Sequence, residues 1–142
     1  MRFMVLVKAD ADSESGALPD ERLLNEMGMF NAEMEKAGIL LAGEGLLPSA
    51  KGARVTVTDD KRVVTDGPFA ETKELIAGFW ILQVESLEEA VGWVRRAPNP
   101  RPGSKAEFEV RQVAEVDDFG DAFTPEARAA EEHMRARLAD PR

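Results

Sequence analysis

A ten-residue motif, TDGPFAETKE at residues 65–74, contains the side chains of this chain that could do chemistry. Asp66 could act as a general base, or as a carboxylate that orients a ligand at the mouth of a pocket. The structural alternative is that Asp66 shapes a turn with Gly67 and Pro68, in which its carboxylate accepts hydrogen bonds from backbone N–H groups just downstream. The residues leave both interpretations open, so Asp66 is a candidate catalytic residue.

Five other residues are candidates for binding a ligand. Lys73, beside the carboxylates of Glu71 and Glu74, could be an anion-binding or acid–base group, because burial shifts the pKa of a lysine. The alternative is a solvated surface ion pair worth about 0–1 kcal/mol. Lys73 and Glu74 could face either a pocket or a dimer interface. Arg54 could stabilise developing negative charge. Glu44 lies in a glycine-containing connector and could line a pocket, and Phe69 could do so too, although aromatic side chains more often pack in a core or an interface.

The single histidine, His133, lies far in sequence from the motif. Histidine is the usual proton carrier near neutral pH. A His–Asp dyad would therefore need His133 to fold back or to come from a partner subunit, and the alternative is a solvent-facing position on a helix. No cluster of His, Cys and Asp predicts a metal site, and no glycine pattern predicts a phosphate loop. We expect no metal and no cofactor.

The spacing of apolar residues predicts the elements that must position these side chains. Leu23, Met27, Phe30 and Met34 recur at helical intervals, and Gly38 ends that helix. A capping box at Ser86 and Glu89 opens a second helix. The polar residues 9–20 are expected to form a loop. Strands are expected at 2–8, 39–43, 78–84 and 107–113, with a hairpin formed by 54–58 and 62–65.

This order of elements predicts an α+β fold. Without the hairpin it is βαββαβ, the ferredoxin-like arrangement of an antiparallel sheet with two helices on one face. We expect this domain to span residues 1–114. Residues 115–142 would form a C-terminal extension whose helix opens at Thr124 and Pro125 and packs on its own or a partner subunit. The uncovered face of such a sheet is a common site of dimerisation.

Composition excludes several classes of partner. The chain has 142 residues, is 44% hydrophobic and carries a net charge of −9. That charge disfavours nucleic acid and anionic membrane surfaces, since both recruit clustered Lys and Arg. No apolar run approaches the ~20 residues of a membrane span. Without cysteine the chain has neither disulfides nor thiolate chemistry. We expect a cytoplasmic protein.

The motif and the segment GFWILQVESLEEAVGWVRRAPNP that follows it resemble the YCII-related family, in its DGPF-motif branch. The resemblance runs from Met1 to about Val113. It implies a dimeric ferredoxin-like fold with a ligand pocket. Some YCII-like proteins use a His–Asp pair, and one relative is a dehydrochlorinase of aromatic catabolism. This chain has Leu47 where many relatives carry a histidine, and no imidazole near Met27, where the dyad histidine of YCII proteins falls.

Three functions follow as hypotheses. The first is a small homodimer of unassigned function that binds a small-molecule ligand in a pocket near the DGPF loop. The second is a small enzyme that eliminates or isomerises an organic substrate by proton transfer, with Asp66 as the base. The third is a regulatory module that acts through contacts with another protein.

Overall fold

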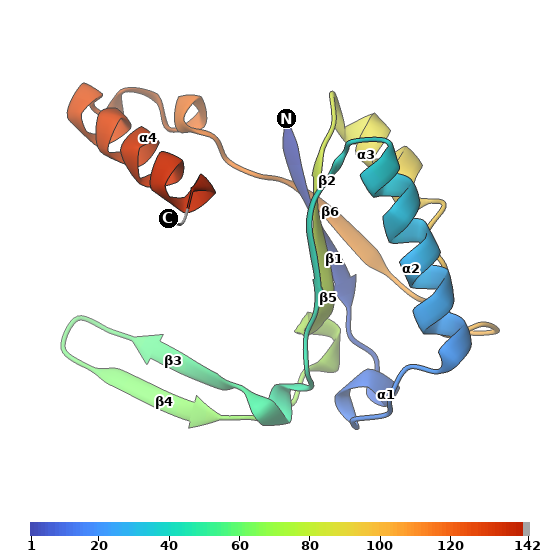
Figure 1. Cartoon of the computed structure of the whole chain (residues 1–142). Helices are drawn as coiled ribbons and strands as arrows, with labels where there is room; N and C mark the ends of the chain where they lie inside the picture. Colours follow the sequence, from blue (N-terminus) through green and yellow to red (C-terminus); the bar gives the residue numbers. More distant parts are fainter. Residues whose placement is uncertain (141–142) are drawn as a thin grey trace. The chain divides into compact units, whose positions relative to one another are not determined.

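A four-stranded antiparallel sheet organises the first part of the chain (Figure 1). The computed structural model describes residues 1–140, and the chain divides into two compact units, Met1–Gln112 and Val113–Arg142. The sheet lies in the first unit, where its strand order is β2-β5-β1-β6. The strands are β1 (Arg2–Lys8), β2 (Leu40–Gly45), β5 (Ile76–Gln83) and β6 (Phe108–Gln112). With the helices between them, these strands form the expected ferredoxin-like fold.

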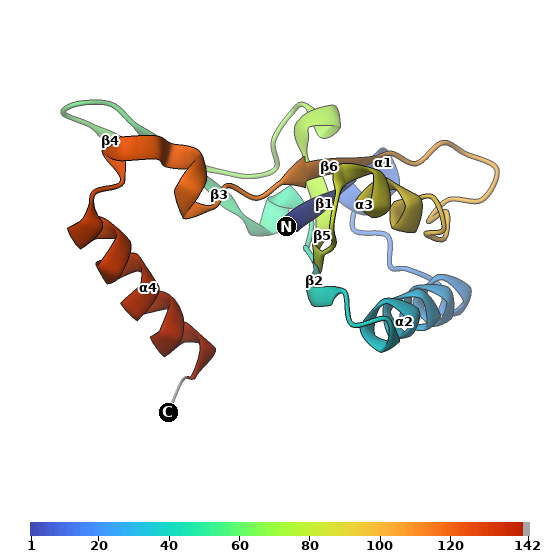
Figure 2. The same cartoon turned by 90° about the horizontal axis from the view of Figure 1, so that it is seen from above.

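Two helices pack on one face of this sheet. They are α2 (Glu21–Lys36) and α3 (Leu87–Val94), and both lie on the same side of the strands (Figures 1 and 2). The buried core joins them to the sheet: its members are Phe3, Val5, Phe30, Met34, Ile39, Trp80, Leu82, Val84 and Ala90. The register places Val5 opposite Trp80 and Phe3 opposite Leu82, which puts these four side chains on the helix-covered face.

The ends of the helices follow the signals in the sequence. Asp20 caps α2 by accepting a hydrogen bond from the Leu23 N–H at 2.8 Å. Gly38, with φ +76°, follows the helix in the left-handed conformation that favours glycine. Ser86 caps α3 by accepting from the Glu89 N–H. Glu89 in turn accepts from the N–H of Glu85.

One local expectation was wrong. The segment 9–20 is not all loop, because residues Ala11–Glu14 form the short helix α1. Asp10 accepts a hydrogen bond from the Ser13 N–H at 2.7 Å, and the Ser13 hydroxyl accepts from the Asp10 N–H at 2.9 Å. These reciprocal bonds satisfy backbone groups that a loop would leave to water, so four residues suffice to form a turn of helix.

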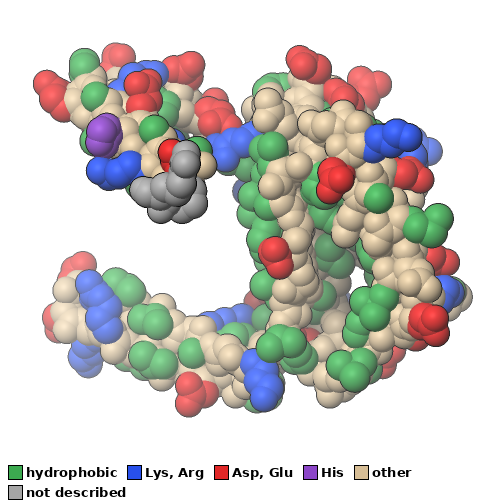
Figure 3. Space-filling view, in the orientation of Figure 1, with side chains coloured by type: hydrophobic (Ala, Val, Ile, Leu, Met, Phe, Trp, Pro, Cys, Tyr) green, Lys and Arg blue, Asp and Glu red, His purple; other side chains and the backbone are tan. Residues whose placement is uncertain are grey.

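The inserted hairpin is a separate two-stranded sheet of β3 (Ala53–Val57) and β4 (Arg62–Asp66). Every residue of both strands is exposed, and hydrophobic side chains are visible along the hairpin (Figure 3). Val55 lies directly opposite Val64. Two-stranded hairpins are marginally stable in water by themselves. The valines of the hairpin therefore leave apolar side chains exposed along both of its strands.

The second unit contains the 3-10 helix η3 (Val116–Ala122) and the helix α4 (Pro125–Ala139). Thr124 caps α4 by accepting from the Ala127 N–H, as its position before Pro125 indicated. No residue of α4 is buried, and His133 is exposed on it. Within residues 1–140, no helix is both long and apolar enough to cross a membrane.

Candidate functional site

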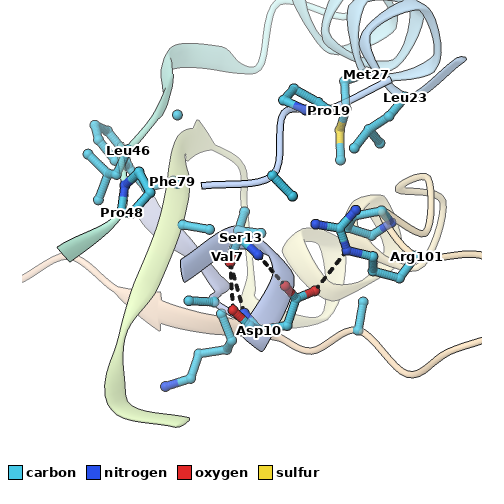
Figure 4. A pocket seen from close by; sticks show the side chains of 18 of the residues that line it. Val7, Asp10, Ser13, Pro19, Leu23, Met27, Leu46, Pro48, Phe79 and Arg101 are labelled. Carbon is cyan, nitrogen blue, oxygen red and sulfur yellow. Dashed lines mark hydrogen bonds and ion pairs between the residues drawn. The ribbon is translucent and has the colours of Figure 1, made fainter. Parts of the chain in front are cut away.

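The first unit contains a cleft of about 860 Å³, within the range of ~300–1,000 Å³ typical of small-molecule sites. Its walls come from the segment around α1, the first half of α2, the ends of β2 and β5, and the loop before β6. Most of the lining is apolar, including Leu23, Met27, Leu46, Pro48 and Phe79 (Figure 4). Trp80 also lines it, so part of the cleft lies where α2 packs against the sheet.

The charged residues along the cleft carry both signs. The positive charge comes from Lys8, Lys73, Lys105 and Arg101, and the negative charge comes from Asp10, Glu44 and Glu107. The Arg101 Nε lies 3.2 Å from the Asp10 Oδ2 and 3.4 Å from the Asp12 Oδ2. Figure 4 shows the Arg101 side chain reaching across to the cap of α1. This contact ties α1 to the loop that leads into β6, across 91 residues of sequence.

The Asp10 carboxylate is held in its charged form. Burial raises the pKa of this carboxyl, but the hydrogen bond from the Ser13 N–H and the positive charge of Arg101 outweigh burial. The pKa of Asp10 therefore lies below its ordinary value of 3.8. With its oxygens already engaged by Ser13 and Arg101, Asp10 serves the structure of the cleft wall.

The DGPF motif reaches the cleft wall through Ser49. The Phe69 N–H donates to the Ser49 Oγ at 3.0 Å. The Ser49 Oγ–H donates to the Glu14 Oε2 at 2.6 Å, and the Ser49 N–H donates to the Glu14 Oε1 at 3.0 Å. Glu14 is the last residue of α1. These three hydrogen bonds connect the motif to the helix that lines the cleft.

Gly67 fits this connection because it has no side chain. A Cβ at residue 67 would lie 1.7 Å from the carbonyl oxygen of Ser49, far closer than any contact between unbonded atoms. The Gly67 N–H donates to the carbonyl of Gly52 at 3.0 Å, which closes the base of the hairpin. The glycine of the motif is thus required by the close approach of two backbone segments.

The hydrogen-bonded turn that was one of the two interpretations of Asp66 is not formed. The downstream N–H of Phe69 donates to Ser49, because the chain turns toward the Ser49 segment and not back on Asp66. Asp66 is exposed at the end of β4. Among residues 1–140 no group makes a hydrogen bond or ion pair with its carboxylate, and Asp66 is not one of the residues that line the cleft.

The other candidate residues divide into two groups. Glu44 and Lys73 line the cleft. Arg54 and Phe69 lie together elsewhere, with the guanidinium carbon of Arg54 4.0 Å from the centre of the Phe69 ring. Glu74 is exposed outside the cleft, in the 3-10 helix η2 (Thr72–Glu74). The roles of all five in binding stay predictions.

Sequence reasoning missed the polar residues that the cleft uses. Asp10 and Ser13 lie in the segment 9–20 that was expected to be a loop, and Arg101 lies outside every predicted helix and strand. Asn31 also lines the cleft, and its oxygen accepts a hydrogen bond from the Trp80 Nε1–H at 2.8 Å. A signal for Asn31 was present, since it is four residues after Met27 and three before Met34 and so is a polar residue on the apolar face of α2.

Comparisons with known proteins show a matching family model, a similar sequence and a similar solved structure. The family model described as a YCII-related domain matches residues 1–115. An uncharacterized protein of Rhizobium meliloti (strain 1021) is 35% identical over 95 residues, which cover 67% of this chain and 76% of that protein. A solved structure of 5-chloro-2-hydroxyhydroquinone dehydrochlorinase from Burkholderia phenoliruptrix AC1100, in complex with 2,5-dihydroxybenzoquinone, is similar at 17% identity with a TM-score of 0.42. It covers 81% of this chain and 95% of the enzyme.

Replacing Gly67 by alanine tests the contact between the motif and Ser49. We expect Gly67→Ala to lower the melting temperature strongly or to abolish folding, because the new Cβ would overlap the Ser49 carbonyl. Gly52→Ala is the matched control at the base of the same hairpin, since its Cβ would meet Ser49 at an ordinary 3.6 Å. Equal melting temperatures for the two variants in differential scanning calorimetry would contradict this account.

The ion pair of Asp10 predicts a pH dependence. Because the folded-state pKa is lowered, the charged carboxylate stabilises the fold above its ordinary pKa, and this contribution disappears as the pH falls through the folded value. Asp10→Asn, which keeps an oxygen for the Ser13 N–H, should lower the free energy of unfolding at pH 7 by up to about 1 kcal/mol. At an acidic pH below the folded-state pKa of Asp10, the difference should vanish.

Urea denaturation at both pH values measures this effect. Asp59→Asn, in the exposed turn of the hairpin, is the control and should behave alike at both. A deficit of Asp10→Asn that persists unchanged at low pH would count against a role for the Asp10 charge.

Proposed function

This chain belongs to the YCII-related family, and from that premise and the cleft we propose that it binds a small, largely apolar organic molecule. The observation that carries the proposal is the cleft of about 860 Å³ with its mostly apolar lining. An apolar cleft of this size with a few polar groups along its walls is typical of a small-molecule site. Elements from both halves of the sequence build it, and hydrogen bonds from Ser49 and Arg101 hold its α1 wall in place.

The geometry supports binding more directly than it supports proton transfer by Asp66. A base must reach the proton that it removes, and Asp66 is exposed outside the lining of the cleft. The carboxylates along the cleft are Asp10, Glu44 and Glu107. The motif instead supports the cleft through the bond from Phe69 to Ser49. We therefore place the ligand near the DGPF turn but assign the turn a structural role.

We also propose that the protein is a homodimer. In the first unit, the face of the sheet opposite the helices presents Met4, Leu6 and Ile81, which are half-buried. Phe79, which also lines the edge of the cleft, lies on this face opposite Leu6, and Met4 lies opposite Ile81. The exposed hairpin adds Val55 and Val64. A second copy would cover these apolar rows, and a stable interface requires about 1,200–2,000 Å² of buried surface. A cytoplasmic location stays a prediction of the sequence.

Binding in the cleft can be tested with 8-anilinonaphthalene-1-sulfonate as the probe. We expect one probe per chain to bind by isothermal titration calorimetry. Leu23→Trp, which places a larger side chain in the cleft, should weaken binding by at least about tenfold. Val91→Trp, on the exposed side of α3, is the control and should leave binding unchanged. If Leu23→Trp binds the probe as tightly as the wild-type protein does, the cleft is not the binding site.

The dimer is tested by sedimentation velocity on the full chain. We expect a species of twice the chain mass, and Leu6→Glu should convert it to one of single mass, because a carboxylate would be buried against the apolar rows. Leu87→Glu, at an exposed position on α3, should remain dimeric. A wild-type protein of single chain mass at all concentrations would contradict the proposal.

A further inference from the structure

Asn31 is a polar residue with a fixed orientation in an apolar part of the cleft. It lies on α2, and its Oδ1 accepts a hydrogen bond from the Trp80 Nε1–H at 2.8 Å. An indole N–H can only donate, so the atom of the amide that faces it must be the oxygen. The NH₂ group of Asn31 is therefore the end that is left for other partners.

The Trp80 ring that fixes Asn31 is itself held on two sides. The Phe30 ring meets it edge to face, with centroids 5.5 Å apart, and the Phe108 ring stacks on it at 6.0 Å. Only 6% of Trp80 is exposed. Because the indole cannot rotate without disturbing both rings, the amide of Asn31 is held in one orientation as well.

The NH₂ group of Asn31 is free to bind a ligand. No residue in the described range 1–140 accepts a hydrogen bond from it, and no side-chain nitrogen or oxygen in that range is both fully buried and unpaired. The NH₂ must therefore reach accessible space. Asn31 lines the cleft together with Met27 and Trp80, so the cleft is where that donor can meet a partner.

The charges along the cleft are compatible with a ligand oxygen, including an anionic one. The chain as a whole has a net charge of −9, yet cations along the cleft outnumber carboxylates. Asp10 is already paired with Arg101. Lys8, Lys73 and Lys105 are left to balance Glu44 and Glu107, and no ion pair within residues 1–140 engages these lysines.

We propose that Asn31 determines the class of ligand, which is an apolar molecule that carries a hydrogen-bond acceptor oxygen. This oxygen accepts a hydrogen bond from the NH₂ group of Asn31, while the apolar body of the ligand lies against Met27 and Trp80. The oxygen can belong to a carboxylate, a phenolate or a carbonyl group. This inference rests on the proposed function, because it names the chemistry of the molecule that the cleft holds. A donor-only group such as an ammonium has no acceptor to offer Asn31.

Three naphthalene probes of similar shape test the class: 2-naphthoate, the neutral ketone 2-acetylnaphthalene, and 2-naphthylmethylamine, which is an ammonium at pH 7. We expect the acid and the ketone to bind the wild-type protein at least about fivefold more tightly than the amine in isothermal titration calorimetry. Comparing the acid with the ketone shows whether the ligand's charge adds to the hydrogen bond. Equal affinity for the amine would overturn the proposal, and so would no binding by any of the three.

Asn31→Asp isolates the donor. Aspartate keeps an oxygen for the Trp80 N–H but replaces the NH₂ group by an acceptor. We expect the affinity for 2-naphthoate to fall at least about tenfold and that for the ketone to fall about two- to tenfold, while the affinity for the amine rises. Asn25→Asp is the matched control, because it adds the same charge at an exposed position on the same helix and should change each affinity less than about twofold.

The outcomes separate this inference from the function on which it rests. If Asn31→Asp leaves the affinity for 2-naphthoate unchanged, Asn31 does not select the ligand, although binding of 8-anilinonaphthalene-1-sulfonate would still support the cleft. If the sulfonate probe also fails to respond to Leu23→Trp, the proposed function itself is wrong. The comparison of probes on the wild-type protein keeps the test decisive even if the variant does not fold.

Discussion

The packing of one indole ring holds the first unit together. Trp80 lies on β5, one of the two inner strands of the sheet. It contacts Phe30 of α2 and Phe108 of β6, and its N–H donates a hydrogen bond to Asn31 of α2. A single side chain thus attaches α2 to the sheet by aromatic packing and by a directional hydrogen bond. The cleft exists beside this contact because α2 is fixed at Trp80 while its first half, around Leu23 and Met27, lines open space.

A second set of contacts holds the opposite wall. The segment around α1 has no buried residue, so packing alone cannot keep it in place. Its position depends on polar contacts at both ends: Asp10 with Arg101, and Glu14 with Ser49. Since Ser49 also accepts from Phe69, the most recognisable motif of the sequence acts as a support for this wall. The fold thereby connects a distinctive motif to the cleft through Ser49, and Lys73 of the same motif lines the cleft.

The sequence predicted the sheet, both covering helices and the hairpin because each has a local signal: apolar alternation, helical spacing, a capping residue or a turn. It did not predict the site, whose contacts join residues far apart in sequence. Glu14 and Ser49 are separated by 35 residues, and Asp10 and Arg101 by 91. No periodic pattern of apolar residues indicates which residues distant in sequence form such contacts. Asn31 carries a local signal, because it is an amide on the apolar face of a helix, but it was not among the predicted site residues, and no local pattern identifies Trp80 as its partner.

The placement of Trp80 also gives the protein an optical property. The chain contains two tryptophans and no tyrosine, so its ultraviolet emission comes almost entirely from Trp80 and Trp93. The two indoles have different surroundings: Trp80 lies in the core beside the cleft, and Trp93 lies under the guanidinium of Arg96, whose carbon is 4.6 Å from the ring centre. The emission of Trp80 is therefore sensitive to what occupies the cleft. In a Trp93→Phe variant this emission would be observed alone, without any added label.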